Sequence, residues 1–251
     1  MTTALITGAS AGLGTEFAWQ LAESGHDLVL VARSVDRLET LAEQLRAAAR
    51  VQVEVLPADL ADPDQLALVV ERVHAGGPAP VDVLVLNAGY GLGATFHRTA
   101  PGVEEAALAV MVTSVLVLAR AAVEEMVPRG RGTIITVGSV AGLMASGTYS
   151  AHKAWVRTFT EGLGRSLRGT GVTATVVNPG LTRTEFHDRA GWRASGFPRW
   201  AWLSASDVVA DTLAAARAGR VEVTPSLRYR AASWLLRHLP RGVVRRISRS
   251  F

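Results

Sequence analysis

Short apolar segments alternate with longer segments of helical periodicity through the first 180 residues of the chain. The apolar segments are rich in Val, Ile and Leu throughout, as expected for parallel strands covered on both faces. They are Thr3–Thr7, Leu28–Ala32, Val51–Leu56, Val83–Leu86, Thr133–Val137 and Val172–Val177. The helical segments are Leu13–Ser24, Val35–Ala49, Pro63–Ala75, Val103–Met126 and Tyr149–Arg168. This alternation predicts right-handed crossovers and an α/β fold, a doubly wound parallel sheet in a three-layer α/β/α arrangement.

The pattern loosens after the sixth predicted strand. Residues 182–205 form an irregular segment rich in aromatic side chains, which we interpret as a small substrate lid. A helix near Ser206–Ala218 and a short strand near Val221–Val223 are expected next, followed by C-terminal amphipathic helices within residues 226–251. Because no repeat or low-complexity linker interrupts the chain, residues 1–251 are expected to form one domain. The longest uncharged apolar run, Ala106–Ala119, is too short to cross a bilayer and predicts a buried helix.

Charge is distributed unevenly along the chain. The net charge is +4, but seven arginines and no acidic residue follow Glu222, and subtracting those arginines leaves −3 for the remainder. The body of the protein therefore lacks the basic face that nucleic-acid binding requires. The absence of cysteine excludes disulfides, thiolate metal sites and cysteine nucleophiles. The first residues enter a strand directly and do not resemble a signal peptide, so we expect a cytoplasmic protein.

The basic tail, from Tyr229 to Phe251, has apolar residues at helical spacing with arginines between them. The apolar set is Leu235, Leu236, Leu239, Val243, Val244, Ile247 and Phe251. The favoured interpretation is an amphipathic lid or interface helix with a solvated basic face. Attachment to an anionic membrane surface is the alternative.

A glycine-rich turn stands where the first predicted strand meets the first helix. Gly8, Gly12 and Gly14 occur there with the spacing Gly-x-x-x-Gly-x-Gly. Glycine allows a tight turn and a close approach of the backbone to a pyrophosphate, and it leaves the amides at the helix N-terminus aimed at phosphate. This context is typical of the dinucleotide-binding turn of a Rossmann fold. The other residues of the turn expected to contact the cofactor are Ser10, Ala11 and Leu13.

The end of the second strand indicates which cofactor binds. A carboxylate there would bond a ribose 2′-hydroxyl and repel a 2′-phosphate. Ala32 supplies no charge, and Arg33, which follows it, can pair with a 2′-phosphate. The sequence therefore predicts NADP(H).

The chain has 26 basic residues, of which only Lys153 is a lysine. Tyr149 precedes it by four residues, which places both side chains on one face of a helix. A neighbouring ammonium favours the ionised form of a phenol, and it can also donate to ribose hydroxyls. Ser139 follows the Thr133–Val137 strand at the edge of the sheet where ligands bind, and it can donate to a substrate carbonyl. These three residues are the candidate catalytic group.

With three further motifs, the chain resembles the short-chain dehydrogenase/reductase family, in its branch of single-domain enzymes of about this length. The motifs are Asp59-Leu60 after the third strand, Asn87-Ala88-Gly89 after the fourth and Asn178-Pro179-Gly180 after the sixth. The resemblance covers roughly residues 3 to 225. It implies hydride transfer between nicotinamide and a substrate carbon, with Tyr149 exchanging the proton on oxygen. Lys153 would bind the nicotinamide ribose and lower the tyrosine pKa, and Ser139 would orient the carbonyl.

The resemblance also implies the remaining cofactor contacts. Asp59 would contact the adenine, the Asn87–Gly89 segment would support the central sheet, and the segment after the sixth strand would hold the nicotinamide end. The implied residues are Asp59, Leu60, Asn87, Ala88, Gly89, Tyr149, Lys153, Pro179, Gly180, Thr182 and Thr184.

Two features depart from the family pattern. Met111 stands where an asparagine usually helps to carry a water-linked proton relay to the lysine. A methionine side chain cannot relay a proton, so we expect activity that is weakened or differently routed. Ser139 precedes Tyr149 by only ten residues. The Ala141–Thr148 loop is therefore shorter than is common in the family, and we expect the site to be open on that side.

Apolar and aromatic residues follow several of the motifs and predict a hydrophobic carbonyl or alcohol substrate. The pocket candidates are Leu92, Leu143, Met144 and Phe186, with Tyr90, Gly91, Leu181 and the tryptophans of residues 182–205 beside them. A 3-oxoacyl-thioester reductase and a non-catalytic NADP(H)-sensing protein remain as alternatives. The helices Val103–Met126 and Tyr149–Arg168 resemble the faces with which this family associates, which favours a homodimer or homotetramer.

The six histidines show no metal-ligand spacing, and we expect no metal. His152 points off the helical face that carries Tyr149 and Lys153, so we expect it at the surface.

Overall fold

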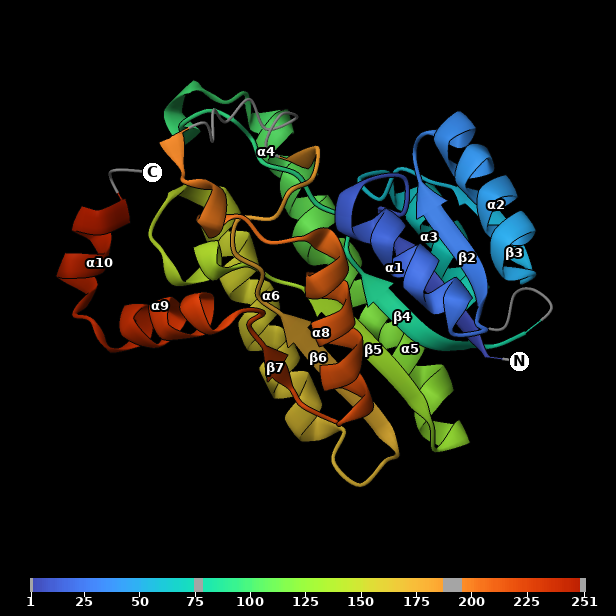
Figure 1. Cartoon of the computed structure of the whole chain (residues 1–251). Coiled ribbons are helices and arrows are strands. Elements are labelled where there is room, and N and C mark those ends of the chain that lie inside the picture. Colours follow the sequence, from blue (N-terminus) through green and yellow to red (C-terminus); the bar gives the residue numbers. More distant parts are fainter. Residues whose placement is uncertain (1, 75–78, 187–195, 249–251) are drawn as a thin grey trace.

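A computed structural model describes residues 2–74, 79–186 and 196–248. Seven strands form one parallel sheet in the order β3-β2-β1-β4-β5-β6-β7, as Figure 1 shows. They are β1 (Thr3–Thr7), β2 (Asp27–Ala32), β3 (Val53–Pro57), β4 (Val81–Leu86), β5 (Gly132–Val137), β6 (Val172–Val177) and β7 (Glu222–Val223). The strand order reverses beside β1, and the predicted doubly wound fold is confirmed.

Helices cover both faces of the sheet and complete three layers (Figure 1). On one face lie α1 (Gly12–Glu23), α2 (Val35–Ala49) and α8 (Ala205–Arg217). On the other lie α3 (Pro63–Val73), α4 (Pro101–Leu108), α5 (Ser114–Arg129) and α6 (Gly147–Ser166). Within β1, Ala4 and Ile6 join one core cluster and Leu5 joins the other, because successive side chains of a strand point to opposite faces. Both faces of the strand are therefore buried, which explains why its central residues, Ala4 to Ile6, are all apolar.

The predicted elements agree closely with the structure, apart from one long helix. β1, β6 and α2 have the predicted bounds, and most other elements differ by one or two residues. The helix expected at Val103–Met126 is longer, and it is interrupted by a π-helical turn, η2, at Ala109–Thr113. The prediction of a single regular helix at Val103–Met126 is therefore wrong. A π turn adds one residue to a helical turn and commonly marks a functional site.

The segment from α4 through α5, Pro101–Arg129, is long and apolar enough to cross a membrane, with a mean hydropathy of 2.2 over its most apolar 18 residues. Half of that window is buried inside the fold. The buried side supplies Leu118, Ala122 and Met126 to the core against the sheet. Its composition is thus explained by its position as a core helix.

The C-terminal part of the chain forms two further helices, α9 (Leu227–His238) and α10 (Arg241–Ser248). Figure 1 shows both beyond α6 and β7, on the left of the view and away from the central strands. We call this pair the C-terminal arm. Short helical turns also occur at η1 (Phe96–Arg98), η3 (Val140–Leu143) and η5 (Arg199–Ala201). Trp192 of the predicted lid, Ala75 of the predicted third helix and Phe251 of the tail lie outside the described residues.

Candidate active site

The turn between β1 and α1 requires glycine at Gly8, Gly12 and Gly14. Gly8 and Gly12 have positive φ angles of 67° and 56°, a region that favours glycine. A Cβ on Gly14 would lie 2.1 Å from the carbonyl oxygen of Gly8. The backbone of the turn is therefore held against the first turn of α1, which leaves its amides bare as phosphate binding requires.

Replacing Gly14 with alanine is expected to lower the free energy of unfolding by about 3 kcal/mol, because the new methyl group must displace backbone. Chemical denaturation measures this change. Gly162→Ala is the matched control, since this α6 glycine is exposed and a Cβ there meets nothing within 4 Å. That substitution should stabilise the protein by about 0.5 kcal/mol. Equal effects at the two positions would show that the turn is not tightly packed.

Side chains from distant motifs close around this turn. The amide of Asn87, just after β4, donates to the carbonyl oxygens of Thr7 and Gly8 at 3.0 and 3.2 Å. Thr184, which follows β6, lies against Gly12, where a Cβ would stand 3.1 Å from the threonine Cβ. The residues expected to contact one cofactor thus meet at the carboxyl ends of β1, β4 and β6.

Arg33 and Asp59 lie together at the ends of β2 and β3. The guanidinium of Arg33 is 3.7 Å from the Asp59 carboxylate, and its side chain is 70% exposed. An exposed ion pair of this kind is weak, so the arginine remains available to a phosphate. Tyr90 is close enough for both charges to affect its pKa, which burial raises. Tyr90 was a pocket candidate, but these neighbours place it toward the cofactor end of the sheet edge.

The three candidate catalytic residues converge where β5, η3 and α6 meet. Ser139 follows β5, and its hydroxyl accepts from the Ala141 amide at 3.1 Å. It is also close enough to Tyr149 to lower the pKa of the phenol. Lys153 is buried, and its Nζ donates to the carbonyl oxygen of Val137 at 2.7 Å. That nitrogen lies 5.7 Å from the centre of the Tyr149 ring. One helical turn of α6 therefore presents the phenol and the ammonium to the same space.

Burial controls the protonation of this pair. It raises the pKa of Tyr149 to about 12, and the hydrogen bond to Ser139 acts in the opposite direction. It lowers the pKa of Lys153 to about 8. Lys153 was expected to lower the pKa of Tyr149, but the raising effect of burial dominates in this structure. The phenol stays protonated across the neutral range, in the state that can donate a proton.

Met111 lies beside the lysine, within the π turn. A Cβ built on Gly89 would be 3.4 Å from both the Met111 Sδ and the Lys153 Nζ, so the two side chains flank one point. Met111 is fully buried and joins the core cluster. A thioether neither donates nor readily accepts a proton, so the described contacts provide no side-chain relay at this position.

Replacing Met111 with asparagine is expected to raise kcat by about 10-fold, because an amide can hydrogen-bond the water or the ammonium beside it. It should also lower the free energy of unfolding by about 2 kcal/mol, since a polar group replaces a buried apolar one. Steady-state kinetics measures the first effect. Met111→Leu is the control, because it keeps the volume without adding a polar group, and its kcat should not change. A lower kcat for Met111→Asn, with fold and cofactor affinity preserved, would contradict the idea that Met111 costs rate.

Aromatic and apolar side chains border the catalytic group. The Phe186 ring centre is 5.6 Å from that of Tyr149. Leu143 is buried in η3, Met144 follows it, and Leu92 packs against the core beside β4. Trp200, one of the lid tryptophans, is mostly exposed, so the lid tryptophans are not all part of a packed wall.

Tyr229 in α9 organises the segment after β6, and sequence analysis missed it. Its hydroxyl accepts from the Leu181 amide at 3.1 Å and donates to the Ala201 carbonyl at 2.8 Å. Its ring lies so close to Gly180 that a Cβ there would be 2.2 Å away. Gly180 is therefore glycine because an aromatic ring covers it. The only signal in the sequence was that the chain has three tyrosines.

The C-terminal arm also covers the short loop between Ser139 and Tyr149. The Ser248 hydroxyl accepts from the Ala145 amide at 2.9 Å, and Arg241 donates to the Leu143 carbonyl at 3.4 Å. The expectation that the short Ala141–Thr148 loop leaves the site open on its side is therefore wrong, because α10 packs on this loop.

His152 is buried, with 7% of its surface exposed, so the expected surface position is wrong. Burial lowers its pKa, and Glu104 of α4, which lies nearby, acts in the opposite direction. Its Nδ1 has no hydrogen-bond partner among the described residues. Within residues 2–74, 79–186 and 196–248, no three His, Asp or Glu side chains gather in a way that could hold a metal ion.

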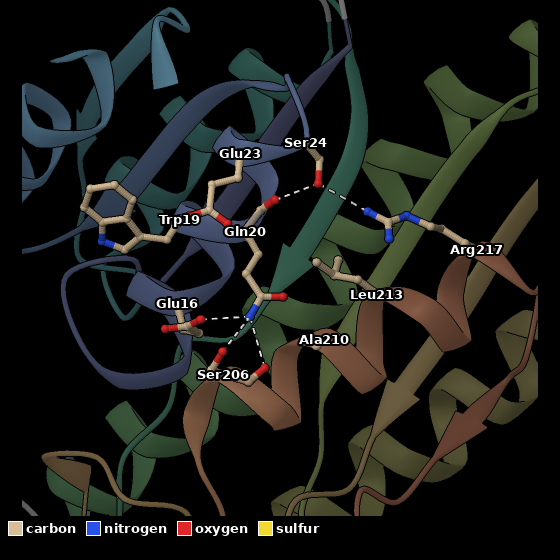
Figure 2. A pocket seen from close by; sticks show the side chains of 9 residues that line it. All are labelled: Glu16, Trp19, Gln20, Glu23, Ser24, Ser206, Ala210, Leu213 and Arg217. Carbon is tan, nitrogen blue, oxygen red and sulfur yellow. Dashed lines mark hydrogen bonds between the residues drawn. The ribbon is translucent and has the colours of Figure 1, made fainter. Parts of the chain in front are cut away.

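A concavity with a volume of about 440 Å³ lies between α1 and α8, away from the predicted site residues. Figure 2 shows that its polar side chains face one another. Gln20 donates to Glu16 and to the Ser206 carbonyl, and Arg217 donates to Ser24. Because these groups bond each other, the groove is explained as a polar contact between helices.

Comparison with known proteins agrees with this arrangement. Residues 2–192 match the family model described as short chain dehydrogenase. The NADP-dependent 3-hydroxy acid dehydrogenase YdfG of Salmonella typhi is 36% identical over 190 residues, which cover 72% of this chain and 73% of that protein.

Two solved structures resemble the whole fold. A short-chain dehydrogenase from Sphingobium yanoikuyae in complex with NADPH has a TM-score of 0.86 at 33% identity, covering 96% of this chain and 97% of that one. The bulky-bulky ketone specific alcohol dehydrogenase from Comamonas testosteroni has a TM-score of 0.81 at 29% identity, covering 96% and 95%. The chain is an oxidoreductase that belongs to the short-chain dehydrogenase/reductase family.

Proposed function

We propose that the protein transfers a hydride between NADP(H) and a hydrophobic carbonyl or alcohol, with Tyr149 as general acid and base. The observation that carries the proposal is the position of Tyr149 beside the buried Lys153, whose Nζ lies 5.7 Å from the centre of the tyrosine ring, with Ser139 close enough to affect the pKa of the phenol. A pure binding protein has little use for such a group. The similar dehydrogenase in complex with NADPH supports the cofactor, and the similar bulky-bulky ketone specific alcohol dehydrogenase supports the substrate class.

The described residues fit a dinucleotide phosphate. The bare turn at Gly14 would hold the pyrophosphate at the N-terminus of α1, and exposed Arg33 would meet the 2′-phosphate. Lys153 would donate hydrogen bonds to ribose hydroxyls, either in addition to the Val137 carbonyl oxygen or in place of it. When bound, the nicotinamide supplies or accepts the hydride.

The protein side chains manage the proton and the substrate oxygen. In the direction of reduction, Ser139 donates a hydrogen bond to the carbonyl oxygen and Tyr149 donates the proton to it. The positive charge of Lys153 stabilises the phenolate that remains. Phe186, packed on the tyrosine ring, would exclude water from this oxygen and favour an apolar substituent.

The test uses full-length protein with NADPH and a panel of aryl ketones, aldehydes, 3-oxo acids and 3-oxoacyl thioesters, following NADPH oxidation. We expect turnover with apolar ketones and aldehydes. Preference for thioesters would select the acyl-thioester reductase instead. Tight NADPH binding without turnover on any of these classes would indicate a cofactor-sensing protein.

Replacing Arg33 with alanine is expected to weaken NADPH binding by about 10-fold, because a charge-assisted pair with the 2′-phosphate is lost. NADH binding should not change, since NADH lacks that phosphate. Titration calorimetry with both cofactors measures this difference. Arg37→Ala is the control, because that arginine is also exposed, at 55%, and lies closer to its carboxylate partner, 3.2 Å from Glu185. Equal affinities of the unmodified protein for NADPH and NADH would refute the cofactor assignment.

Association of copies through the long helix fits its surface. Leu108 and Leu116 project from the outer side of α4 and α5 and are largely exposed. Trp155 and Phe159 stack on α6 with ring centres 4.7 Å apart. These features support the proposal of a homodimer or homotetramer.

A further inference from the structure

The outward face of α9 is apolar, which is the reverse of an ordinary surface helix. Leu227, Trp234 and Leu235 are 76%, 62% and 51% exposed. Together with Ala231 they recur at helical spacing and lie on one side of the helix. The inward side carries Tyr229, which holds the segment after β6. An exposed apolar stripe of this size on a small helix indicates an interaction surface.

Arginines border this stripe on both sides. At 100° per residue, Arg228 falls on one side of it and Arg230 falls on the other. In α10, Val243 and Ile247 are also exposed, with Arg245 and Arg246 exposed beside them in the sequence. No acidic residue follows Glu222 in the sequence. The arm therefore combines an apolar surface with a positive rim and offers no negative charge of its own.

Some of these arginines are already engaged within the protein. Arg237 pairs with Glu222, and Arg228 donates to the Trp200 carbonyl and lies over its ring. Within the part of the chain that the structure describes, Arg230, Arg245 and Arg246 make no ion pair with a carboxylate. Among the described arginines of the arm, these three are therefore the charges that can meet a partner.

Two occupants have to be compared. In a two-fold dimer the arm would meet the same face of a second copy, and the arginine rims would repel each other. A bilayer surface instead offers hydrocarbon to the stripe and phosphate to the rim. Tryptophan is favoured at that interface, and arginine can reach headgroups along its apolar stem. Charge complementarity therefore selects an anionic lipid surface.

We propose that the C-terminal arm is a docking surface for an anionic lipid bilayer, with Leu227, Trp234 and Leu235 inserted and Arg230, Arg245 and Arg246 on the phosphates. The arm also contacts Leu143 and Ala145. Docking would thus hold the loop beside the catalytic group close to the lipid, a consequence that rests on the proposed function. The binding itself does not depend on turnover.

The test is co-sedimentation of the full-length protein with vesicles of phosphatidylcholine containing phosphatidylglycerol, and with phosphatidylcholine alone. We expect binding to the anionic vesicles at physiological salt, weakening as salt increases. The triple variant Arg230→Gln/Arg245→Gln/Arg246→Gln should bind about 100-fold more weakly, at about 5-fold for each arginine. Trp234→Ser should weaken binding by about 10-fold. Leu68→Ser, which removes an exposed leucine from α3, is the control and should not change binding.

All four substituted arm residues are exposed, so the variants should keep the thermal midpoint of the unmodified protein, and circular dichroism checks this. Absence of binding to the anionic vesicles overturns the proposal, as does equal binding to both vesicle types or to the triple variant. Light scattering tests the other occupant. If the protein does not bind vesicles but forms an oligomer that Trp234→Ser dissociates, the arm is a protein interface and the lipid proposal is wrong. NADPH turnover is measured separately, so a failure of the proposed function would leave this result standing.

Discussion

Replacing Tyr149 with phenylalanine is expected to lower kcat by about 1,000-fold for reduction of an apolar ketone. Only the hydroxyl is lost, and with it the proton donor to the substrate oxygen. The pKa of this phenol is raised to about 12 by burial, so the proton is present throughout the neutral range. The ring remains to pack against Phe186, and the pocket should keep its shape. Steady-state kinetics measures kcat, and fluorescence titration measures the affinity for NADPH, which should change little.

The other tyrosines provide matched controls. Tyr90→Phe removes a partly buried hydroxyl at the same sheet edge but toward the cofactor end, and it should leave kcat within about 3-fold of its original value. Tyr229→Phe removes two hydrogen bonds of the segment after β6, and it should affect stability more than the chemical step. If Tyr149→Phe kept a kcat within 10-fold of the unmodified protein, another group would have to donate the proton.

The sheet could be predicted because its strands are covered on both faces. Leu5 packs into one cluster and Ile6 into the other, so the central positions of β1 must all be apolar. The glycine turn was equally visible, since a Cβ on Gly14 would collide with backbone and nothing but glycine fits. The pair Tyr149 and Lys153 followed from the period of one helix. In each case the constraint acts within one element or between neighbours in the chain.

Contacts between distant segments could not be predicted. The Tyr229 ring over Gly180 joins residues separated by an entire helix and strand. His152 points away from the catalytic face, as helical period requires, but the fold buries it on that side, where Glu104 is near enough to affect its pKa. The pKa of Tyr149 likewise depends on burial, which a spacing of four residues does not reveal. The sequence predicted candidates for the site residues, and the packing determines the protonation of Tyr149 and Lys153.

Replacing Lys153 is expected to lower kcat/KM by about 100-fold even when the substitute is arginine. The guanidinium keeps the charge, but it is planar and larger than the ammonium, so it cannot keep the bond to Val137 and meet the ribose in the same space. Lys153→Met removes the charge and should be slower still. A lower kcat/KM for Lys153→Met than for Lys153→Arg would show that the charge of the group contributes to the rate separately from its shape. Equal rates for lysine and arginine would leave the single lysine of the chain unexplained.

The pH dependence gives an independent readout of the same residue. Because burial lowers the pKa of Lys153 to about 8, the rate of reduction should fall above that pH as the ammonium loses its proton. Lys153→Met should lack this alkaline decrease.

The free energy of unfolding should change in the opposite direction. Between about pH 8 and 10 the unfolded chain, with an ordinary lysine pKa, binds more protons than the folded one, so the stability contributed by this group rises with pH. Above pH 10 the raised pKa of Tyr149 opposes the trend, because the unfolded phenol ionises first. Denaturation curves for the cofactor-free protein and for Lys153→Met, measured from pH 7 to 10, give the free energy of unfolding at each pH. The two proteins should differ in how steeply this free energy changes with pH. Equal pH dependence would show that Lys153 is not the buried group that titrates.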